Sequence, residues 1–510
     1  MPLQSILFEY PEQAPRDEAG GVPDFFADLN LGQVVDAICA GREEYDLKPF
    51  FYRSLQSSDA VKYRHEVMRD LEHADLFASV SAFAEKLRQM RAHLAQADNL
   101  YYKYQKQAWF LDAVEIYCDA VHRFAEDLAT PAVTSRGFAA LRRYFSAYVA
   151  SPDFTALFAA TKRIKEHLAT VKYCVLIQGS SITVRKYESE PDYSKEVEGT
   201  FARFNESAVK DYRVQFSEWP DMNHIEAQIL EFVALLYPEI FSNLDGYCAE
   251  NRNYLDATVA VFDREVQFYI SYLEHLAAFK HAGLHFCYPE VSERKDIYSS
   301  EGFDLALAHK LIAENRPVVR NDFYLRGRER IFAVSGPNQG GKTTFARTFG
   351  QLHFLASLGC PVPGKEARLL LFDRLFTHFE REENIANLHG KLQDDLIRIH
   401  DILGQTTPRS ILIMNEIFTS TTLRDAIFLS EKMLERIIDL DLLCVWVTFI
   451  DEVAAYGEQV VSMVSATEPG NPASRTFKVL RRPADGLAHA MAIAEKYGLT
   501  YDRLKERLHA

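Results

Sequence analysis

The chain has 510 residues, which is too long for a single hydrophobic core, so we expect about two to four domains. Apolar residues make up 48% of the chain and charged residues 25%, an ordinary composition for a soluble globular protein. The net charge of −15 argues against a protein that coats DNA through a positive surface, although local basic patches can still contact phosphates.

The cysteines and the N-terminus predict a cytoplasmic protein. The seven cysteines are scattered without a C-x-x-C pair, which argues against a zinc site or a disulfide framework and suits a reducing compartment. The first residues lack the basic and apolar regions of a signal peptide. No uncharged apolar stretch is long enough to span a membrane, so we expect no membrane contact.

Helical patterns dominate the first part of the chain. Residues 1–28 are rich in Pro, Glu, Asp and Gly and predict an irregular N-terminal segment. From Leu29 to about residue 170 the apolar spacing is helical, with a cap predicted at Ser58 and an apolar face that begins at Val61.

A β-hairpin is predicted inside the helical region. Val171–Ile177 and Ile182–Tyr187 are apolar or alternating runs, and Gln178–Ser181 supplies a turn. Helical spacing then resumes, most clearly from Tyr254 to Lys280, where apolar residues step alternately by three and four. We interpret this stripe as the buried face of one long helix and infer no dimerisation from it.

Strands and helices alternate from about residue 291 onward. Four apolar runs predict strands at Ile331–Val334, Ile411–Met414, Leu443–Thr448 and Val460–Val464. Alternation of this kind is typical of an α/β domain with a mostly parallel sheet.

A phosphate-binding loop follows the first of these strands. Residues 336–344 fit the pattern G-x-x-x-x-G-K-[ST] between a strand and a helix, the context that the motif requires. Glycines let backbone N–H groups close around phosphate oxygens, the lysine reaches the terminal phosphates, and the threonine after it can ligate Mg²⁺. The predicted nucleotide site comprises Gly336, Pro337, Asn338, Gln339, Gly340, Gly341, Lys342, Thr343 and Thr344.

A second strand ends in the polar pair Asn415–Glu416. In ATPases with this loop, an Asp normally stands at the first of these positions and holds Mg²⁺. Glu416 is placed to act as the general base that orients the attacking water. The amide oxygen of Asn415 can ligate Mg²⁺ together with Thr343, but without a charge. Either hydrolysis is slow and the protein is a nucleotide-binding switch, or neighbouring groups compensate for the missing negative charge at the metal site.

Five segments resemble the MutS family of DNA mismatch repair ATPases. The loop is similar to that family's G-P-N-M-G-G-K-S-T, with Gln339 for Met and Thr343 for Ser. The resemblance is specific from about residue 319 to residue 499 and weaker before it. The other segments are Val319–Asp322 (V-x-N-D), Leu412–Ile417 (L-x-M-D-E-I), Thr419–Asp425 (G-T-S-T-x-D-G) and the tail Asp485–Leu499.

The resemblance implies a fold, partners and a division of the chain. The fold is multidomain: an all-α helical core with a lever and clamp, carrying a small β-hairpin insertion, and then a C-terminal α/β P-loop ATPase domain of the ABC type. The implied divisions are 1–28, 29–290 and 291–510. ATPase domains of this family pair, so a homodimer is expected. DNA is expected at the clamp, and the 171–187 hairpin is our candidate for strands near it.

Departures from the family pattern put efficient turnover in doubt. Asn415 replaces the metal-holding Asp, Phe449 stands where the family has His, and Gly390 replaces a Ser in the segment Ala386–Leu396 that resembles the family's cross-dimer contact. The chain also begins at the helical core, so we expect a short member without the N-terminal mismatch-binding domain.

Three functions remain open. We favour a MutS-like protein that couples ATP and Mg²⁺ binding, with slow hydrolysis, to DNA binding in mismatch repair or related DNA processing. The alternatives are a nucleotide-gated structural adaptor with little or no hydrolysis and a small-molecule P-loop kinase. A basic stretch that includes Arg136 and Lys165 could contact phosphates, but we favour a solvated helix face.

Overall fold

The computed structural model describes residues 5–10, 21–130, 133–179, 181–190, 222–380, 390–468, 471–484 and 505. The chain forms two compact units that are interleaved in sequence. The predicted domain boundaries at residues 28 and 290 divide the chain into consecutive segments, and they stay a prediction. The helical unit comprises Met1–Leu3, His73–Ala132 and Ala139–Asp263, and the sheet unit comprises Gln4–Glu72, Val133–Phe138 and Arg264–Ala510.

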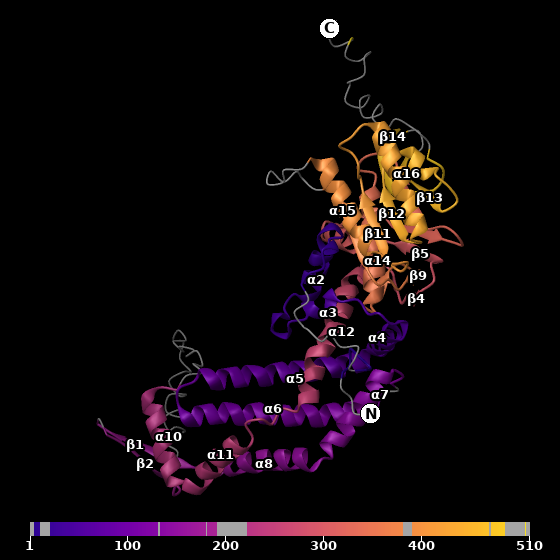
Figure 1. Ribbon diagram of the computed structural model, residues 1–510. Helices are drawn as coiled ribbons and strands as arrows, with labels where there is room; N and C mark the ends of the chain where they lie inside the picture. Colours follow the sequence, from indigo (N-terminus) through magenta and orange to yellow (C-terminus); the bar gives the residue numbers. More distant parts are fainter. Residues whose placement is uncertain are drawn as a thin grey trace, which may run out of the picture. The chain divides into compact units, whose positions relative to one another are not determined.

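Long helices that run side by side make up the helical unit (Figure 1). Both α5 (Ala74–Asn99) and α8 (Pro152–Ala169) pack along α6 (Lys103–Ala129). The Ser151 side chain accepts a hydrogen bond from the backbone N–H of Phe154 and caps α8, whose first residue is a proline. Proline suits this position because the first N–H groups of a helix have no partner within it.

Four phenylalanine rings form the core of the helical unit. Phe83 of α5 stacks on Phe124 of α6 with ring centroids 4.3 Å apart. Phe145 of α7 (Arg136–Val149) and Phe262 of α12 (Ala257–His281) lie 5.0 Å and 5.7 Å from Phe124. All four rings are buried. Aromatic pairs in such geometries stabilise a core beyond their buried area.

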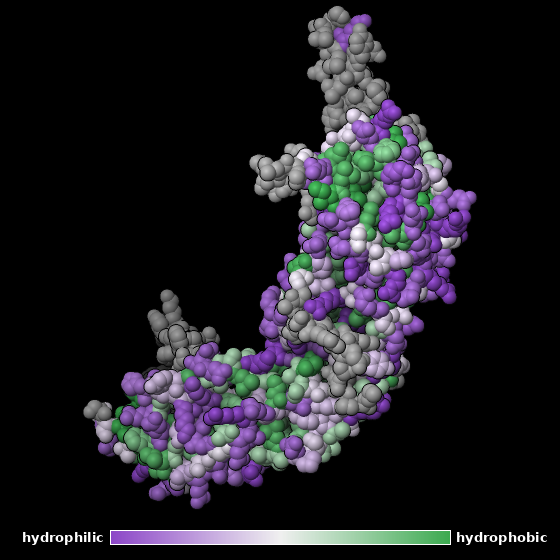
Figure 2. Space-filling model, in the orientation of Figure 1, coloured by the Kyte–Doolittle hydropathy of each residue, from purple (hydrophilic) through white to green (hydrophobic). Residues whose placement is uncertain are grey.

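The predicted hairpin is confirmed. Strand β1 (Tyr173–Gln178) pairs with β2 (Ser181–Lys186) in an antiparallel ladder, and Gly179 adopts a positive φ in the turn. Helices α10 (His224–Leu236) and α11 (Pro238–Glu250) lie at the same end of the unit. Apolar side chains gather on this surface (Figure 2), where Ile177 is 71% and Leu235 74% exposed.

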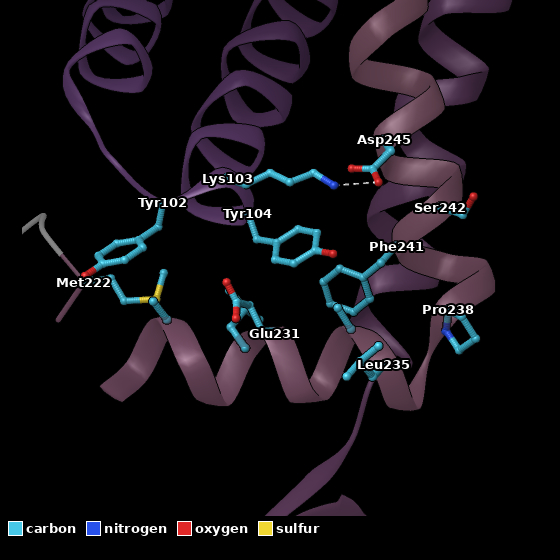
Figure 3. A pocket seen from close by; sticks show the side chains of 13 residues that line it. Tyr102, Lys103, Tyr104, Met222, Glu231, Leu235, Pro238, Phe241, Ser242 and Asp245 are labelled. Atoms are coloured by element: carbon cyan, nitrogen blue, oxygen red, sulfur yellow. Dashed lines mark hydrogen bonds and ion pairs between the residues drawn. The ribbon is translucent and has the colours of Figure 1, made fainter. Parts of the chain in front are cut away.

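A cavity of about 490 Å³ lies between the start of α6, α10 and α11 (Figure 3). Tyr104, Leu235 and Phe241 supply apolar walls. Lys103 Nζ donates to Asp245 Oδ2 over 2.7 Å at the edge of the cavity. This pair lies at the surface, so it adds little to stability.

A six-stranded sheet forms the centre of the sheet unit. Its strand order is β10-β11-β12-β7-β13-β14, and the first five strands are parallel while β14 runs antiparallel to β13. The four predicted strands are confirmed within a few residues, and β10 and β14 were not predicted. The strands are β7 (Ile331–Ser335), β10 (Leu375–Phe379), β11 (Ile411–Asn415), β12 (Leu443–Val447), β13 (Val460–Glu468) and β14 (Asn471–Arg481).

Helices cover both faces of this sheet, which explains its nearly uniform apolar strands. Alternate residues such as Leu412 and Met414 pack with α15 (Lys391–Gln405), α16 (Leu423–Asp439) and α17 (Asp451–Ala454). On the other face, Phe332 packs edge-on against Phe345 and Phe349 of α14 (Lys342–Ser357). The layered α/β arrangement predicted for this region is confirmed.

Two smaller sheets and several short helices complete the sheet unit. Strands β4, β9, β5 and β6 form one sheet in that order, and β3 pairs with β8 in the other. Their bounds are β3 (Phe286–Cys287), β4 (Glu290–Ser292), β5 (Ile297–Gly302), β6 (Asn321–Leu325), β8 (Val362–Pro363), β9 (Glu366–Leu370), α1 (Phe25–Asp28), α2 (Leu31–Cys39), the 3-10 turn Glu43–Tyr45, α3 (Lys48–Tyr52), α4 (Ser58–Leu71) and α13 (Leu305–Ala313).

Buried polar contacts join the N-terminal residues to α14 and the residue that follows it. Gln351 of α14, fully buried, donates from Nε2 to the Leu29 carbonyl and to Asp304 Oδ1, each over 2.9 Å. The guanidinium of Arg64, 1% exposed, donates to the carbonyls of Leu7 and Leu358. Buried polar groups must be paired in this way to be tolerated, so these contacts place residues 4–72 in the sheet unit.

The cap of α4 differs from the prediction by one residue. Ser57, not Ser58, accepts the hydrogen bond from the Asp59 N–H, and Ser58 is the first helical residue. The predicted apolar face is buried, as Val61 and Met68 show. Among the described helices, none is both long enough and apolar enough to cross a membrane.

Candidate nucleotide site

The predicted phosphate loop lies between the carboxyl end of β7 and the start of α14. Gly336 has φ +117°, Gln339 +58° and Gly341 +97°. Glycine adopts such conformations without the steric cost that a side chain imposes. The loop therefore turns its backbone around the N-terminus of α14, the arrangement that binds anions through N–H groups and the helix dipole.

Ser465 of β13 is hydrogen-bonded to the phosphate loop. Its Oγ donates to the Gly340 carbonyl over 2.6 Å, and its side chain is 1% exposed. β13 pairs with β7 in parallel register, with Val464 opposite Ser335, so Ser465 reaches the loop directly. Sequence reasoning missed this residue; its only signal is a small polar residue directly after the predicted strand Val460–Val464.

We expect Gly340→Ala to disable the loop. An added Cβ at this position would lie 2.3 Å from Ser465 Oγ and 2.8 Å from the Pro337 carbonyl oxygen, and the latter is backbone. Overpacking of this kind costs about 1–3 kcal/mol, so we expect the affinity for ATP to fall about tenfold or more. Isothermal titration calorimetry measures the change.

Gly404→Ala is the matched control for this variant. A Cβ at Gly404 of α15 would meet no atom within 4 Å, so this variant should bind ATP as the wild type does. Equal affinities for the two variants would contradict the steric role assigned to Gly340.

The Lys342 ammonium is enclosed by the loop. Its Nζ donates to the carbonyls of Gly336 and Pro337 over 3.0 Å and 3.4 Å and to Asn338 Oδ1 over 3.3 Å. The side chain is 4% exposed, and this burial lowers the pKa of the ammonium, while the carboxylate of Glu416 opposes the shift. The three oxygens that accept hydrogen bonds from the ammonium are all uncharged.

The two residues predicted to approach Mg²⁺ are in contact. Thr343 Oγ1 donates to Asn415 Oδ1 over 3.0 Å. A hydroxyl and an amide oxygen are ligands that Mg²⁺ accepts, so this donor set fits the ion in chemistry although it supplies no charge. Asn415 is the last residue of β11, two strands from β7, and this order brings it beside the loop.

Glu416 lies next to the loop lysine. Its backbone has φ +56° and its N–H donates to the Val447 carbonyl over 2.9 Å. Its Oε1 is 3.9 Å from Lys342 Nζ. Burial raises the pKa of this carboxyl group, Lys342 lowers it, and the nearby carboxylate of Glu380 raises it further. A left-handed conformation at a non-glycine residue is costly and is concentrated at functional sites.

Two further residues, Arg475 and Phe477, lie against the loop, and Asn321 contacts β14; none of the three was predicted as a site residue. Arg475 Nε donates to the Asn338 carbonyl over 3.3 Å. Asn321 contacts β14 twice: its Nδ2 donates to the Phe477 carbonyl, and its Oδ1 accepts from the Val479 N–H. Phe477 has φ +57° and its backbone lies close to Gly341. The Val319–Asp322 resemblance was the only signal for Asn321.

The structure describes the family departures only in part. Phe449 follows β12, and its ring lies over the Lys342 ammonium with 4.1 Å between Nζ and the ring centroid. Gly390 is the residue before α15. Residues 386–389 of the predicted cross-dimer segment and the tail Asp485–Leu499 lie outside the described residues. In the segment Thr419–Asp425, Thr422 caps α16 by accepting from the Asp425 N–H.

Basic residues considered as phosphate contacts have acidic partners. Arg136 forms ion pairs with Glu66 and Asp59. Lys165 pairs with Glu115 over 2.8 Å. In the hairpin, Arg185 Nη2 lies 2.9 Å from Glu190 Oε1. These pairs favour the interpretation of a solvated helix face for the basic stretch.

Comparisons with known proteins identify the region that contains the loop. Residues 332–500 match the family model of MutS domain V. The DNA mismatch repair protein MutS of Chlorobium phaeovibrioides is 26% identical over 219 residues, covering 42% of this chain and 25% of that protein. MutS of Shouchella clausii is 26% identical over 290 residues, covering 55% and 32%. The mismatch repair protein MSH3 of Eremothecium gossypii is 29% identical over 196 residues, covering 36% and 18%.

The chain spans a third or less of the length of these curated relatives. The similarity includes the loop, β11 with Asn415 and Glu416, and β12, which are the elements that form the candidate site. Both the family model and the relatives agree with the resemblance read from the motifs. Residues 332–500 therefore match MutS domain V, and the chain is similar to MutS-family proteins over about half of its length.

Proposed function

We propose that this protein binds ATP with Mg²⁺ on residues 336–344 and couples nucleotide binding to DNA binding in mismatch repair or a related DNA process. The observation that carries the proposal is the enclosed lysine: Lys342 lies among loop oxygens that phosphate oxygens can replace, beside the Thr343–Asn415 contact. The names of the relatives, DNA mismatch repair proteins, support the process. DNA as partner and a cytoplasmic location rest on the family.

Different residues of the site would bind the phosphates, the Mg²⁺ ion and the attacking water. The backbone of Gly336 to Thr344 and the α14 N-terminus would hold the phosphates, and Lys342 would neutralise the terminal ones. Thr343 and Asn415 would hold Mg²⁺, which neutralises charge that develops on the phosphate oxygens. Glu416, whose pKa is raised by burial, would accept the proton of the attacking water.

We further propose an ABC-type ATPase domain that forms a homodimer through its nucleotide sites, as the family resemblance implies. A second candidate function is the nucleotide-gated adaptor. Two residues favour it: Asn415 carries no charge, and Phe449 has a phenyl ring where the family has an imidazole. A small-molecule kinase is supported by no feature of the described structure beyond the loop itself.

Steady-state ATP hydrolysis tests the proposal. We expect the purified protein to hydrolyse ATP, with a rate that duplex, mismatched or branched DNA changes. Glu416→Gln serves as the blank, because it removes the proposed base, an effect of about 10²–10⁴-fold in rate for general bases. A rate equal to the blank with ATP still bound would reject the ATPase and leave the adaptor. A protein that binds no ATP would reject both.

A further inference from the structure

The Lys342 ammonium has neighbours of two kinds. Three are neutral oxygens of the loop, from Gly336, Pro337 and Asn338. The other two come from outside the loop: the Glu416 carboxylate at 3.9 Å and the ring of Phe449 at 4.1 Å. The ammonium thus contacts both the loop and this second pair of groups.

The backbone on either side of Phe449 is fixed, whereas its ring is accessible. Thr448, 4% exposed, donates its N–H to the Val334 carbonyl, and its Oγ1 accepts from the Ile450 N–H over 3.0 Å. The Phe449 side chain is 49% exposed. The ring can therefore turn away from Lys342 without disturbing the sheet.

The ring and a terminal phosphate compete for the same ammonium. The face of an aromatic ring carries partial negative charge and attracts a cation, but it repels an anion. A loop lysine of this type contacts the terminal phosphates of a bound triphosphate. The phosphate nearest to both Lys342 and Glu416 would be the terminal one, because Glu416 is the group proposed to orient water toward it. A diphosphate lacks that group.

We propose that Phe449 is a specificity-determining residue that disfavours triphosphate relative to diphosphate by holding the Lys342 ammonium against its ring. The inference rests on the proposed nucleotide site. The nucleotide-free and diphosphate states keep the ring on the lysine, and a triphosphate displaces it. The imidazole that the family has at this position can donate a hydrogen bond to a phosphate, whereas phenylalanine cannot.

Binding of two nucleotides to three proteins tests the inference. We would titrate ADP and the β,γ-imido analogue of ATP, each with Mg²⁺, into the wild type, Phe449→Leu and Phe449→Tyr by calorimetry. Leucine keeps an apolar side chain without a ring. We expect Phe449→Leu to shift the triphosphate-to-diphosphate affinity ratio about three- to tenfold toward triphosphate, the range of a half-exposed cation–π contact. Phe449→Tyr keeps the ring face and should retain the wild-type ratio.

The outcomes separate the inference from the proposed function. An unchanged ratio in Phe449→Leu, with nucleotide bound, would overturn the inference alone. An equal shift in Phe449→Tyr would also overturn it, because the effect would not then depend on the ring face. A wild type that binds neither nucleotide would overturn both. Equal thermal midpoints of the three proteins would show that a change in the ratio does not reflect lost stability.

Discussion

Asn415→Asp will raise the ATP turnover of this protein by about tenfold or more, if the missing metal-binding charge limits catalysis. Asn415 Oδ1 already accepts a hydrogen bond from Thr343 Oγ1, and a carboxylate keeps that acceptor in the same place. It adds a negative charge where Mg²⁺ is proposed to bind. Stronger metal binding lowers the energy of the charged transition state, and steady-state hydrolysis at saturating ATP and varied Mg²⁺ measures the gain.

The control for Asn415→Asp adds the same charge outside the site. Asn315 is exposed after α13, at φ +53°, a conformation that aspartate tolerates. Asn315→Asp should leave turnover unchanged. Unchanged turnover in Asn415→Asp as well would show that another feature, such as Phe449 or Gly390, limits hydrolysis, and it would favour the adaptor.

Acidification will destabilise the sheet unit strongly, because three of its histidines are held neutral. Burial lowers the pKa of His65 to about 3 and those of His275 and His353 to about 4. The unfolded chain binds protons at these residues below its ordinary pKa of about 6.5, whereas the folded chain does not. The contribution of these three histidines to the free energy of unfolding is therefore intact above about pH 6.5 and is lost as the pH drops toward 4.

The size of this loss follows from the difference in proton binding. Each histidine should cost about 2 kcal/mol of unfolding free energy at pH 5, and together they should cost about 6 kcal/mol as an upper bound. Denaturant unfolding between pH 7 and pH 5 measures the loss. His353→Phe should make the pH dependence less steep, whatever it does to stability at pH 7.

Local patterns in the sequence determined a large part of this structure. The phosphate loop, the four strands of the main sheet that were predicted, the hairpin and the long helix α12 all depend on residues that are neighbours along the chain. Local backbone and solvation preferences are enough to produce these elements, without a contribution from distant residues. The preferences appear as glycine at positions of positive φ, as apolar runs buried on both faces, and as helical spacing. The family motifs lie in these same segments.

The tertiary structure alone decided which distant residues meet at the loop. Ser465 and Phe477 come from β13 and β14, and the sheet order sets them beside Gly340 and Gly341. No spacing in the sequence encodes that order, because strand neighbours are chosen by packing of the whole sheet. The contact between Phe449 and Lys342 has the same origin: a ring 107 residues along the chain lies over the ammonium because β12 and β7 are adjacent strands. The interleaving of the two units likewise follows from buried contacts, such as Gln351 with Leu29, that join residues 322 positions apart.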